Sequence, residues 1–289
     1  MASKKLKLPV NIPVSKIHPF EGNPYKVLDN DEMNNLICSI QEQGILTPII
    51  IRPIENTDEY EVISGHRRLH ATVKAGMKEV PAFIYAVTRD EAAIMLVDSN
   101  LHREHILPSE KAFAYKLKLE AIKRQGERTD LTSDQVGRKL ESAELIANKS
   151  DDSKTQVRRY IRLTNLIPEL LDLVDEEKIA LTPAVELSYL SDEEQYSLLG
   201  TIEEEDRTPS LSQAVRFKKL SQAGELSDES IETIMQEDKA NQKPMFKVSM
   251  ERLQKVAPKV KDKDFEDFVL KACEHYYRYL QRQRNRDAR

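Results

Sequence analysis

One short stretch in the first third of the chain constrains the fold most. A β-prone run, residues 60–63, leads to Gly65 and then to a segment in which Leu69 and Val73 recur at helical spacing. Gly76 ends that predicted helix. A strand that leads through a glycine into a helix exposes the unpaired N–H groups of the first helical turn. The positive end of the helix dipole lies at the same point. The stretch therefore predicts an anion site, with an ordinary basic helix start after a strand as the alternative.

Arg67 and Arg68 fall in the first turn of that predicted helix. A guanidinium group presents its N–H donors in a fixed plane, which matches the oxygens of a phosphate. We therefore interpret the anion as a phosphate.

The composition argues against a membrane protein. The chain has 289 residues, of which 32% are charged, and a mean hydropathy of -0.57. No apolar run approaches the ~18 residues of a membrane-spanning helix. We expect a cytoplasmic protein of two or three domains with no membrane partner.

The net charge of -5 is unevenly distributed. Thirteen acidic residues and one lysine lie between Glu169 and Asp206, so the rest of the chain is net basic. An acidic module repels a phosphate backbone, whereas a basic module attracts it. The overall charge thus neither excludes nor supports nucleic-acid binding, and local patches decide.

Strand and helix patterns alternate after a loose basic leader, residues 1–13. One predicted helix begins after the N-cap candidate Asn30 or Asp31, and the next begins after Thr88. Predicted strands cover residues 14–18, 47–54, 60–63 and 80–86. We therefore expect a small α+β domain over residues 14–105.

A polar cluster ends the second of these helices. It contains Ser99, Asn100 and Arg103. Such a cluster is either solvated surface or part of a binding site, and the residues alone leave both open.

Residues 106–221 are predicted to be helical and to contain a helix-turn-helix. Helices over residues 141–149 and 154–166 flank a polar turn. The second helix starts at the N-cap candidate Ser153 and carries four basic residues and no acid, which suits contact with a DNA backbone and groove. An ordinary amphipathic helix pair is the alternative. The candidate DNA-binding residues are Lys154, Thr155, Gln156, Arg158, Arg159 and Arg162.

The last quarter of the chain divides into a linker and a C-terminal segment. Residues 222–244 are polar and predict a linker around one short helix. Residues 245–289 predict a strand at 246–250 and a helix at 262–284 with a long apolar stripe. That stripe packs either on the chain's own body or on a second copy, which would make a homodimer.

Four motifs, in this order, resemble the ParB family of DNA-partition proteins, with a ParB/sulfiredoxin-like N-terminal domain and a helix-turn-helix. The match covers residues 14 to about 220. The motifs are Gln43–Arg52 (QGILTPIIIR), Ser64–Ala71 (SGHRRLHA), Ser99–Glu104 (SNLHRE) with Pro108–Ala112 (PSEKA), and Arg158–Leu166 (RRYIRLTNL).

The resemblance implies a protein of three segments with separate roles. The N-terminal domain would bind CTP with Mg2+, the helix-turn-helix would bind a palindromic, centromere-like site in double-stranded DNA, and the C-terminal segment would dimerise. The resemblance also implies that CTP closes a sliding clamp and that the N-terminal arm stimulates a ParA-like ATPase. The implied nucleotide-binding residues are Gly65, His66, Arg67 and Arg68 at the triphosphate, Asn100 and Arg103 beside it, with Asn100 as a metal ligand, and Gly44, Thr47 and Pro48 at the base or ribose.

Three positions depart from the family pattern. Thr47 stands where a glutamine is usual, His66 where a glutamate is usual, and Ser99 where an acid is usual. Hydrolysis needs a metal ion and a positioned water, and a carboxylate serves either better than an imidazole or a hydroxyl. CTP binding is therefore expected, and CTPase activity through His66 and Ser99 is left open. Asp98 is an alternative oxygen ligand.

The expected function is that of a sequence-specific DNA-binding partition protein, gated by CTP and associated with a nucleoid or plasmid. The DNA to be segregated would belong to a plasmid, a mobile element or a chromosome. A regulator of transcription or of nucleoid occlusion would show the same motifs. A small-molecule kinase is a further alternative, because the N-terminal domain of the family also resembles free-amino-acid kinases.

Overall fold

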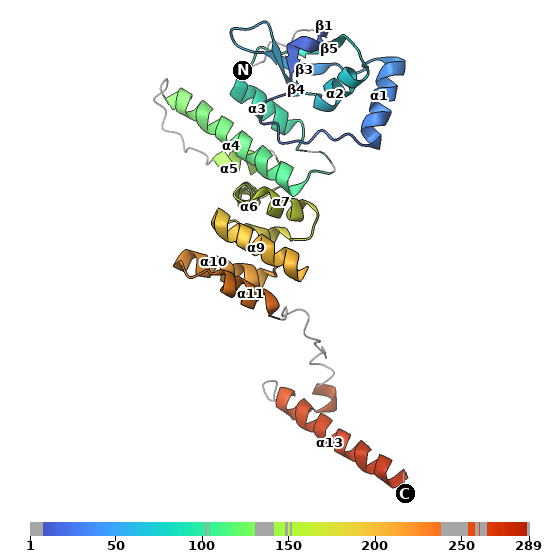
Figure 1. Cartoon of the computed structure of the whole chain (residues 1–289), viewed down its shortest axis with the longest axis vertical. Coiled ribbons are helices and arrows are strands. Elements are labelled where there is room, and N and C mark those ends of the chain that lie inside the picture. The colour runs from blue at the N-terminus through green and yellow to red at the C-terminus, as the bar shows by residue number, and fades with distance from the viewer. Residues whose placement is uncertain are drawn as a thin grey trace. The chain divides into compact units, whose positions relative to one another are not determined.

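A five-stranded mixed sheet organises the N-terminal part of the chain (Figure 1). The computed structural model describes residues 8–101, 103, 105–130, 142–147, 150, 152–237, 254–257, 260 and 265–287. The strands are β1 (Val10–Pro13), β2 (Ile17–His18), β3 (Ile49–Pro53), β4 (Tyr60–Ser64) and β5 (Glu79–Ile84), in the order β1-β5-β3-β4-β2. The pairs β1/β5 and β3/β4 are antiparallel, and β2/β4 and β3/β5 are parallel. This mixed sheet with helices agrees with the predicted α+β class.

Helices cover both faces of the sheet. Adjacent residues of a strand point to opposite faces, and Val62 packs with Leu69 of α2 (His66–Lys74) whereas Ile63 packs with α3 (Arg89–Asp98). Helix α1 (Asp31–Gln43) packs in turn on α2 through Met33 and Ile40. The start of α2 and the end of α3 therefore belong to helices on opposite faces of one sheet.

Helix α4 (Pro108–Asp130) joins the sheet-containing part to the helical part. Ala114 packs with α3, Ala112 belongs to the core of the helical part, and Tyr115 packs with the next two helices, α5 (Ser142–Ala147) and α6 (Lys154–Leu163). The predicted boundary between residues 105 and 106 therefore does not separate two bodies, and residues 1–237 form one compact unit.

Five further helices build the rest of that unit. They are α7 (Pro168–Asp175), α8 (Leu181–Leu187), α9 (Asp192–Glu205), α10 (Leu211–Ala223) and α11 (Asp228–Gln236). Contacts run from α4 to α6 and α7, then to α8 and α9, and on to α10 and α11, as Figure 1 shows. Leucine, isoleucine and Phe217 side chains fill the core between them. The described chain is predominantly helical, as predicted.

Two predicted segment boundaries are wrong. The leader was expected to reach residue 13, but Val10–Pro13 is strand β1, because Ile12 is buried in the sheet core and pairs with Val80. The linker was expected over residues 222–244, but residues 228–236 form α11, whose Ile231, Ile234 and Met235 are buried in the helical core. The short helix foreseen there is thus part of the core.

The remaining residues, 238–289, form a separate unit. Its helix α13 (Phe265–Asp287) agrees with the predicted helix at 262–284. The strand predicted at 246–250 lies outside the described residues. Within the part of the chain that the structure describes, no helix combines the length and the apolar character needed to cross a membrane.

Candidate functional site

Gly65 makes the turn between β4 and α2. Its φ of +103° is left-handed, and a Cβ at this position would lie 2.8 Å from Cγ2 of Ile49 and 3.1 Å from Nη2 of Arg68, so both backbone and space require glycine. No side chain caps the start of α2. The free N–H groups of its first turn and the helix dipole remain available to an anion. The predicted strand, glycine and helix start are confirmed.

A cavity of about 600 Å³ opens beside this turn, a volume suited to a small-molecule ligand. Residues from the start of α2 and the end of α3 share it, because these two helix ends meet at one edge of the sheet. The lining residues are Asn23, Tyr25, Lys26, Val27, Glu32, Asn35, Leu36, Ser64, Gly65, His66, Arg67, Arg68, Ser99, Asn100 and Arg103.

The structure brings together six of the nine candidate nucleotide-binding residues. These are Gly65, His66, Arg67, Arg68, Asn100 and Arg103, and Ser99 lines the cavity with them. The three base-side candidates, Gly44, Thr47 and Pro48, are not among the lining residues. They lie between α1 and β3, and Gly44 ends α1 with a φ of +71°.

The three arginines of the cavity have different partners. Nη2 of Arg67 lies 3.0 Å from Oε2 of Glu32 at the start of α1. Nη1 of Arg68 donates to the backbone carbonyls of Thr47 and Pro48, at 2.5 and 2.9 Å. The guanidinium of Arg103 lies over the ring of Tyr25, 5.5 Å from its centroid. Arg67 and Arg103 thus face the cavity with side-chain partners. Arg68 instead connects the start of α2 to the residues just before β3.

His66 is held neutral. The backbone N–H of Phe20 donates to Nε2 of His66 at 3.3 Å, so the ring proton resides on Nδ1. Burial, with a smaller contribution from the charge of Arg103, lowers the pKa of His66 to about 4. At neutral pH the ring can donate one hydrogen bond from Nδ1, and it lacks the charge that a glutamate would bring to this position.

Asn100 presents an oxygen at the end of α3. Its side-chain nitrogen donates to the carbonyl of Leu96 at 2.7 Å and to Oγ of Ser99 at 3.3 Å, which leaves the amide oxygen for a ligand. Asp98, the alternative oxygen ligand, instead pairs with the fully buried Lys118 of α4 and does not line the cavity. Within the described residues no group of three or more His, Cys, Asp or Glu side chains is arranged to hold a metal ion.

The protein oxygens at this cavity fit a magnesium ion only if phosphates and water supply most of its ligands. Mg2+ in nucleotide sites commonly keeps most of its oxygen ligands from phosphates and water and takes one or two from the protein. The amide oxygen of Asn100 could serve as one such protein ligand. The chain by itself offers no cage for the ion.

The wall opposite α2 was not foreseen from the sequence. It comes from the loop at Asn23, Tyr25 and Lys26 and from Glu32 and Asn35 of α1. The hydroxyl of Tyr25 is buried and has no hydrogen-bond partner among the described residues. The only local signal was the turn at Asn23–Pro24, which says nothing about what the loop faces.

Helices α5 and α6 lie where the sequence predicts the two helices of a helix-turn-helix. Ala143, Ile146 and Val157 are buried with Tyr115 of α4 between these helices. Oγ of Ser153 accepts a hydrogen bond from the backbone N–H of Gln156 at 3.2 Å and caps α6, as predicted.

The turn before α6 is anchored from α4. Asp152, in the polar turn before α6, is not among the described residues with positive φ, and Asp151 lies outside the described residues. Oδ2 of Asp152 instead accepts from the hydroxyl of Tyr115 at 2.5 Å and lies 2.6 Å from Nζ of Lys111. These two partners replace a glycine-type turn with a side-chain anchor.

The six candidate DNA-binding residues divide into two groups. Thr155 and Arg158 are exposed, Gln156 is half-buried, and Nζ of Lys154 lies 3.6 Å from Oε2 of Glu144. The other two arginines bond to α8 and the residue that ends it.

Arg159 and Arg162 make these bonds from the C-terminal half of α6. Arg159 donates to Oγ1 of Thr182 at 2.7 Å. Arg162 donates to the carbonyl oxygen of Ser188 at 2.9 Å, and its guanidinium lies 3.9 Å from the ring centroid of Tyr189. Arg162 therefore fixes α6 on α8, a role that spacing on one helix did not indicate.

Comparison with known proteins defines the family. Residues 2–101 match the model of the ParB N-terminal domain. The chain is 30% identical over 207 residues to the chromosome-partitioning protein Spo0J of Thermus thermophilus, a match that covers 72% of this chain and 70% of that protein. The chain belongs to the ParB family.

A second group of relatives has a different name. The nucleoid occlusion protein of Listeria innocua is 30% identical over 196 residues, which cover 68% of this chain and 63% of that protein.

Two solved structures of a C-terminally truncated ParB from Caulobacter crescentus are also similar. The one complexed to the centromeric parS site shares 20% identity, covers 74% of this chain and 99% of that chain, and has a TM-score of 0.42. The one complexed with CTP-gamma-S shares 22% identity, covers 68% of this chain and 98% of that chain, and has a TM-score of 0.31. At these scores the superpositions carry no further argument.

Proposed function

We propose that this ParB-family protein is a CTP-gated, sequence-specific DNA-binding protein of chromosome or plasmid partition. The observation that carries the proposal is the cavity where the uncapped start of α2 meets Asn100 and Arg103, in the same compact unit as a helix-turn-helix. A nucleotide site and a DNA-binding module joined by α4 can influence each other.

The triphosphate of CTP would lie at the start of α2. The first-turn N–H groups and Arg67 would receive its oxygens, and Arg103 would approach from the end of α3. Mg2+ bound to the phosphates would take the amide oxygen of Asn100. His66 and Ser99 offer no carboxylate beside the phosphates, and this favours nucleotide binding with slow hydrolysis.

DNA would bind at the exposed face of α6. Thr155 and Arg158 are exposed near the start of that helix and would reach base edges, and Lys154 and Gln156 would flank them. The acidic faces of α7 and α9 would point away from the phosphate backbone.

Assembly completes the proposal. Helix α13 presents an apolar groove, and a second copy of the chain would cover it to form a homodimer. A ParA-like ATPase would bind the N-terminal arm, of which residues 1–7 lie outside the described residues. The protein would then be associated with the nucleoid or with a plasmid.

Nucleoid occlusion is the second candidate function, because the Listeria relatives of that name match to the same 30% identity as Spo0J. The two functions would differ in which DNA sites the protein occupies. Mapping the sites that the protein occupies in cells separates them. The kinase alternative has no observation in its favour.

The test of the nucleotide site is calorimetric titration of the full chain with CTP, ATP, GTP and UTP, with and without Mg2+. We expect CTP to bind more tightly than the other three, and Arg67→Gln to weaken that binding about tenfold or more. Arg89→Gln is the matched control, because Arg89 forms an exposed ion pair with Glu21 and does not line the cavity. Failure of the wild-type chain to bind any triphosphate would overturn the proposal.

The DNA module is tested separately. Duplexes selected from a random library should share a palindromic site, and their affinity should fall with salt at a slope of about -0.9 per phosphate contacted. Arg158→Ala should reduce the preference for the selected site over random DNA by about 1–3 kcal/mol. Equal affinity of the wild-type chain for selected and random duplexes would contradict sequence-specific binding.

A further inference from the structure

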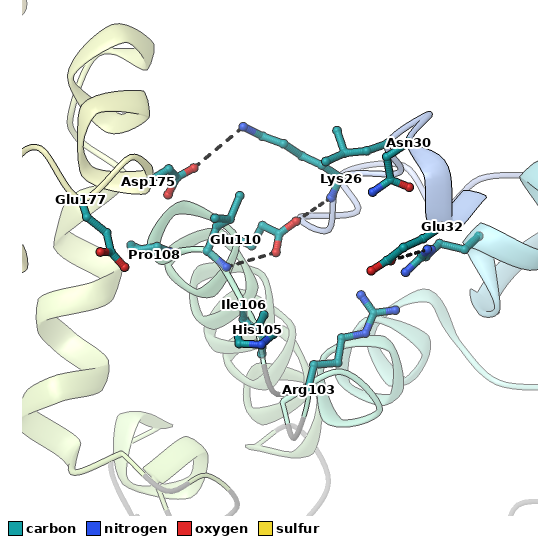
Figure 2. A pocket seen from close by; sticks show the side chains of 13 residues that line it. Lys26, Asn30, Glu32, Arg103, His105, Ile106, Pro108, Glu110, Asp175 and Glu177 are labelled. Atoms are coloured by element: carbon teal, nitrogen blue, oxygen red, sulfur yellow. Dashed lines mark hydrogen bonds and ion pairs between the residues drawn. The ribbon is translucent and has the colours of Figure 1, made fainter. Parts of the chain in front are cut away.

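Lys26 borders two cavities. One is the candidate nucleotide cavity, and the other, of about 450 Å³, lies beside it between the start of α1, the start of α4 and the end of α7 (Figure 2). Four residues line both: Lys26, Glu32, Arg67 and Arg103. The two cavities therefore adjoin at these side chains.

The backbone of Lys26 is fixed on α4. Its N–H donates to Oε1 of Glu110 at 2.9 Å, and the other oxygen of Glu110 accepts from the N–H of Leu107 at 3.3 Å. This clamp holds the loop against the start of α4, so that Lys26 keeps its place between the two cavities.

The side chain of Lys26 is held loosely by comparison. Figure 2 shows it reaching across the second cavity toward Asp175, while Glu32 and Arg103 lie on the other side. Its Nζ lies 3.7 Å from Oδ1 of Asp172 and 3.9 Å from Oδ2 of Asp175, and half of the side chain is exposed. Charge-assisted hydrogen bonds are about 2.7–2.9 Å long, so these are ion pairs without a close bond.

The two α7 carboxylates near Lys26, those of Asp172 and Asp175, have solvent or other hydrogen-bond partners. Asp175 accepts from the backbone N–H of Ser109 at 2.9 Å and from the Ser109 hydroxyl at 2.5 Å. Asp172 is 65% exposed and is solvated by water. Release of Lys26 leaves the buried carboxylate of Asp175 hydrogen-bonded to Ser109, and the exposed ion pair with Asp172 contributes little to stability.

Two of the other three cations at the nucleotide cavity already have hydrogen-bonding partners, and the third, Arg103, lies over the ring of Tyr25. Arg67 pairs with Glu32, and Arg68 donates to the two carbonyls before β3. A bound triphosphate carries several negative charges that need cationic partners. The long, flexible stem of a lysine lets its ammonium move to a new anion while the backbone stays in place.

We infer that the Lys26 ammonium is a further ligand for the phosphates of the bound nucleotide, and that Asp172 and Asp175 hold it when the cavity is empty. The inference rests on the proposed function and adds a residue outside the family motifs. Nucleotide binding then removes an electrostatic link between the N-terminal part and α7, a helix of the core next to the helix-turn-helix. The carboxylates of α7 compete with the nucleotide for one lysine.

A double-mutant cycle on the full chain tests this competition by calorimetric titration with CTP and Mg2+. Lys26→Met should weaken binding about fivefold. The double variant D172N/D175N should strengthen binding about twofold, since asparagine keeps an oxygen for Ser109 but does not attract the ammonium. In the Lys26→Met background, D172N/D175N should have no effect.

The matched control is Lys16→Met. Lys16 forms an exposed ion pair with Asp58 at 2.7 Å and lines neither cavity, so its replacement should leave CTP binding unchanged. Unchanged binding in Lys26→Met, or an equal gain from D172N/D175N with and without Lys26, would overturn the inference while wild-type binding still supported the proposed function. A wild-type chain that binds no triphosphate would overturn both.

Discussion

The backbone N–H of Phe20 donates a hydrogen bond to Nε2 of His66, 46 residues further along the chain. This bond joins the loop after β2 to the start of α2 and fixes the imidazole as a neutral group beside the candidate phosphate site. His66 is thereby defined as a hydrogen-bond donor through Nδ1 at neutral pH.

Protonation of His66 should destabilise the fold in acid. The unfolded chain takes up a proton on this residue near pH 6.5, whereas burial lowers the pKa in the folded chain to about 4. The contribution of neutral His66 is present above pH 6.5 and is lost as the pH falls from 6.5 to 4. Urea unfolding at pH 7.5 and pH 5 should show that His66→Gln removes about 2 kcal/mol of the loss of stability between the two pH values. Identical pH profiles for the wild type and His66→Gln would contradict this assignment.

Gly65→Ala should be far more damaging than a glycine replacement elsewhere. The new Cβ would meet Ile49 at 2.8 Å in a left-handed backbone, so we expect a loss of about 2–4 kcal/mol in the free energy of unfolding. Gly224→Ala is the control, because Gly224 is also left-handed, at φ +70° and ψ 23°, but has open space around it; its replacement should cost about 1 kcal/mol. Thermal and urea unfolding measure both. Equal losses would show that the contact with Ile49 is unimportant.

Tyr115→Phe should loosen the turn before α6. The variant removes the hydroxyl that donates to Asp152 and leaves Lys111 as the partner of that carboxylate among the described residues. We expect a loss of about 1–2 kcal/mol in stability and a weaker affinity for the selected DNA duplex. Tyr196→Phe, at a 53% exposed tyrosine of α9, should change neither quantity. A Tyr115→Phe chain with wild-type DNA affinity would show that the anchor is dispensable for recognition.

Cys273 should report the proposed dimer contact. It lines the apolar groove of α13 with Phe268 and Tyr276, and it is exposed in the single chain. In a Cys38→Ser background, a bismaleimide should link two chains through Cys273, and Phe268→Asp should abolish the link and shift sedimentation toward the monomer. Tyr277→Asp is the control, since Tyr277 is exposed on the same helix and does not line the groove. Persistence of the dimer in Phe268→Asp would place the interface elsewhere.

Local features were predictable because they depend on neighbours in the chain. The predicted caps at Thr88 and Ser153 are observed, and of the two candidates Asn30 and Asp31 the structure selects Asn30. Such a cap is local, because its side-chain oxygen accepts from an N–H only three residues further on. The boundaries at residues 13 and 222 were misplaced. Single apolar residues such as Ile12 and Ile231 do not show whether a segment is buried until the surface they pack against is known.

The candidate site was predicted on one side only. The α2 start and the α3 end were recognised from Gly65 and Asn100, and the structure brings them to one cavity. The opposite wall, at Tyr25 and Lys26, was missed, since those residues carry no motif and meet the cavity only because a loop folds back against α4.

The sequence by itself determined the kind of protein this is: a strand, a glycine and a basic helix start, followed by a second basic helix over residues 154–163, in the order of the ParB family. Only the tertiary structure decided which charges are already engaged. Arg68 donates to carbonyls 20 and 21 residues away, Arg162 bonds to Ser188, and Lys26 lies between a candidate phosphate site and two acids of α7. Backbone hydrogen bonding and side-chain periodicity act over a few residues, whereas the partner of a charged group depends on which distant segments the hydrophobic core brings together.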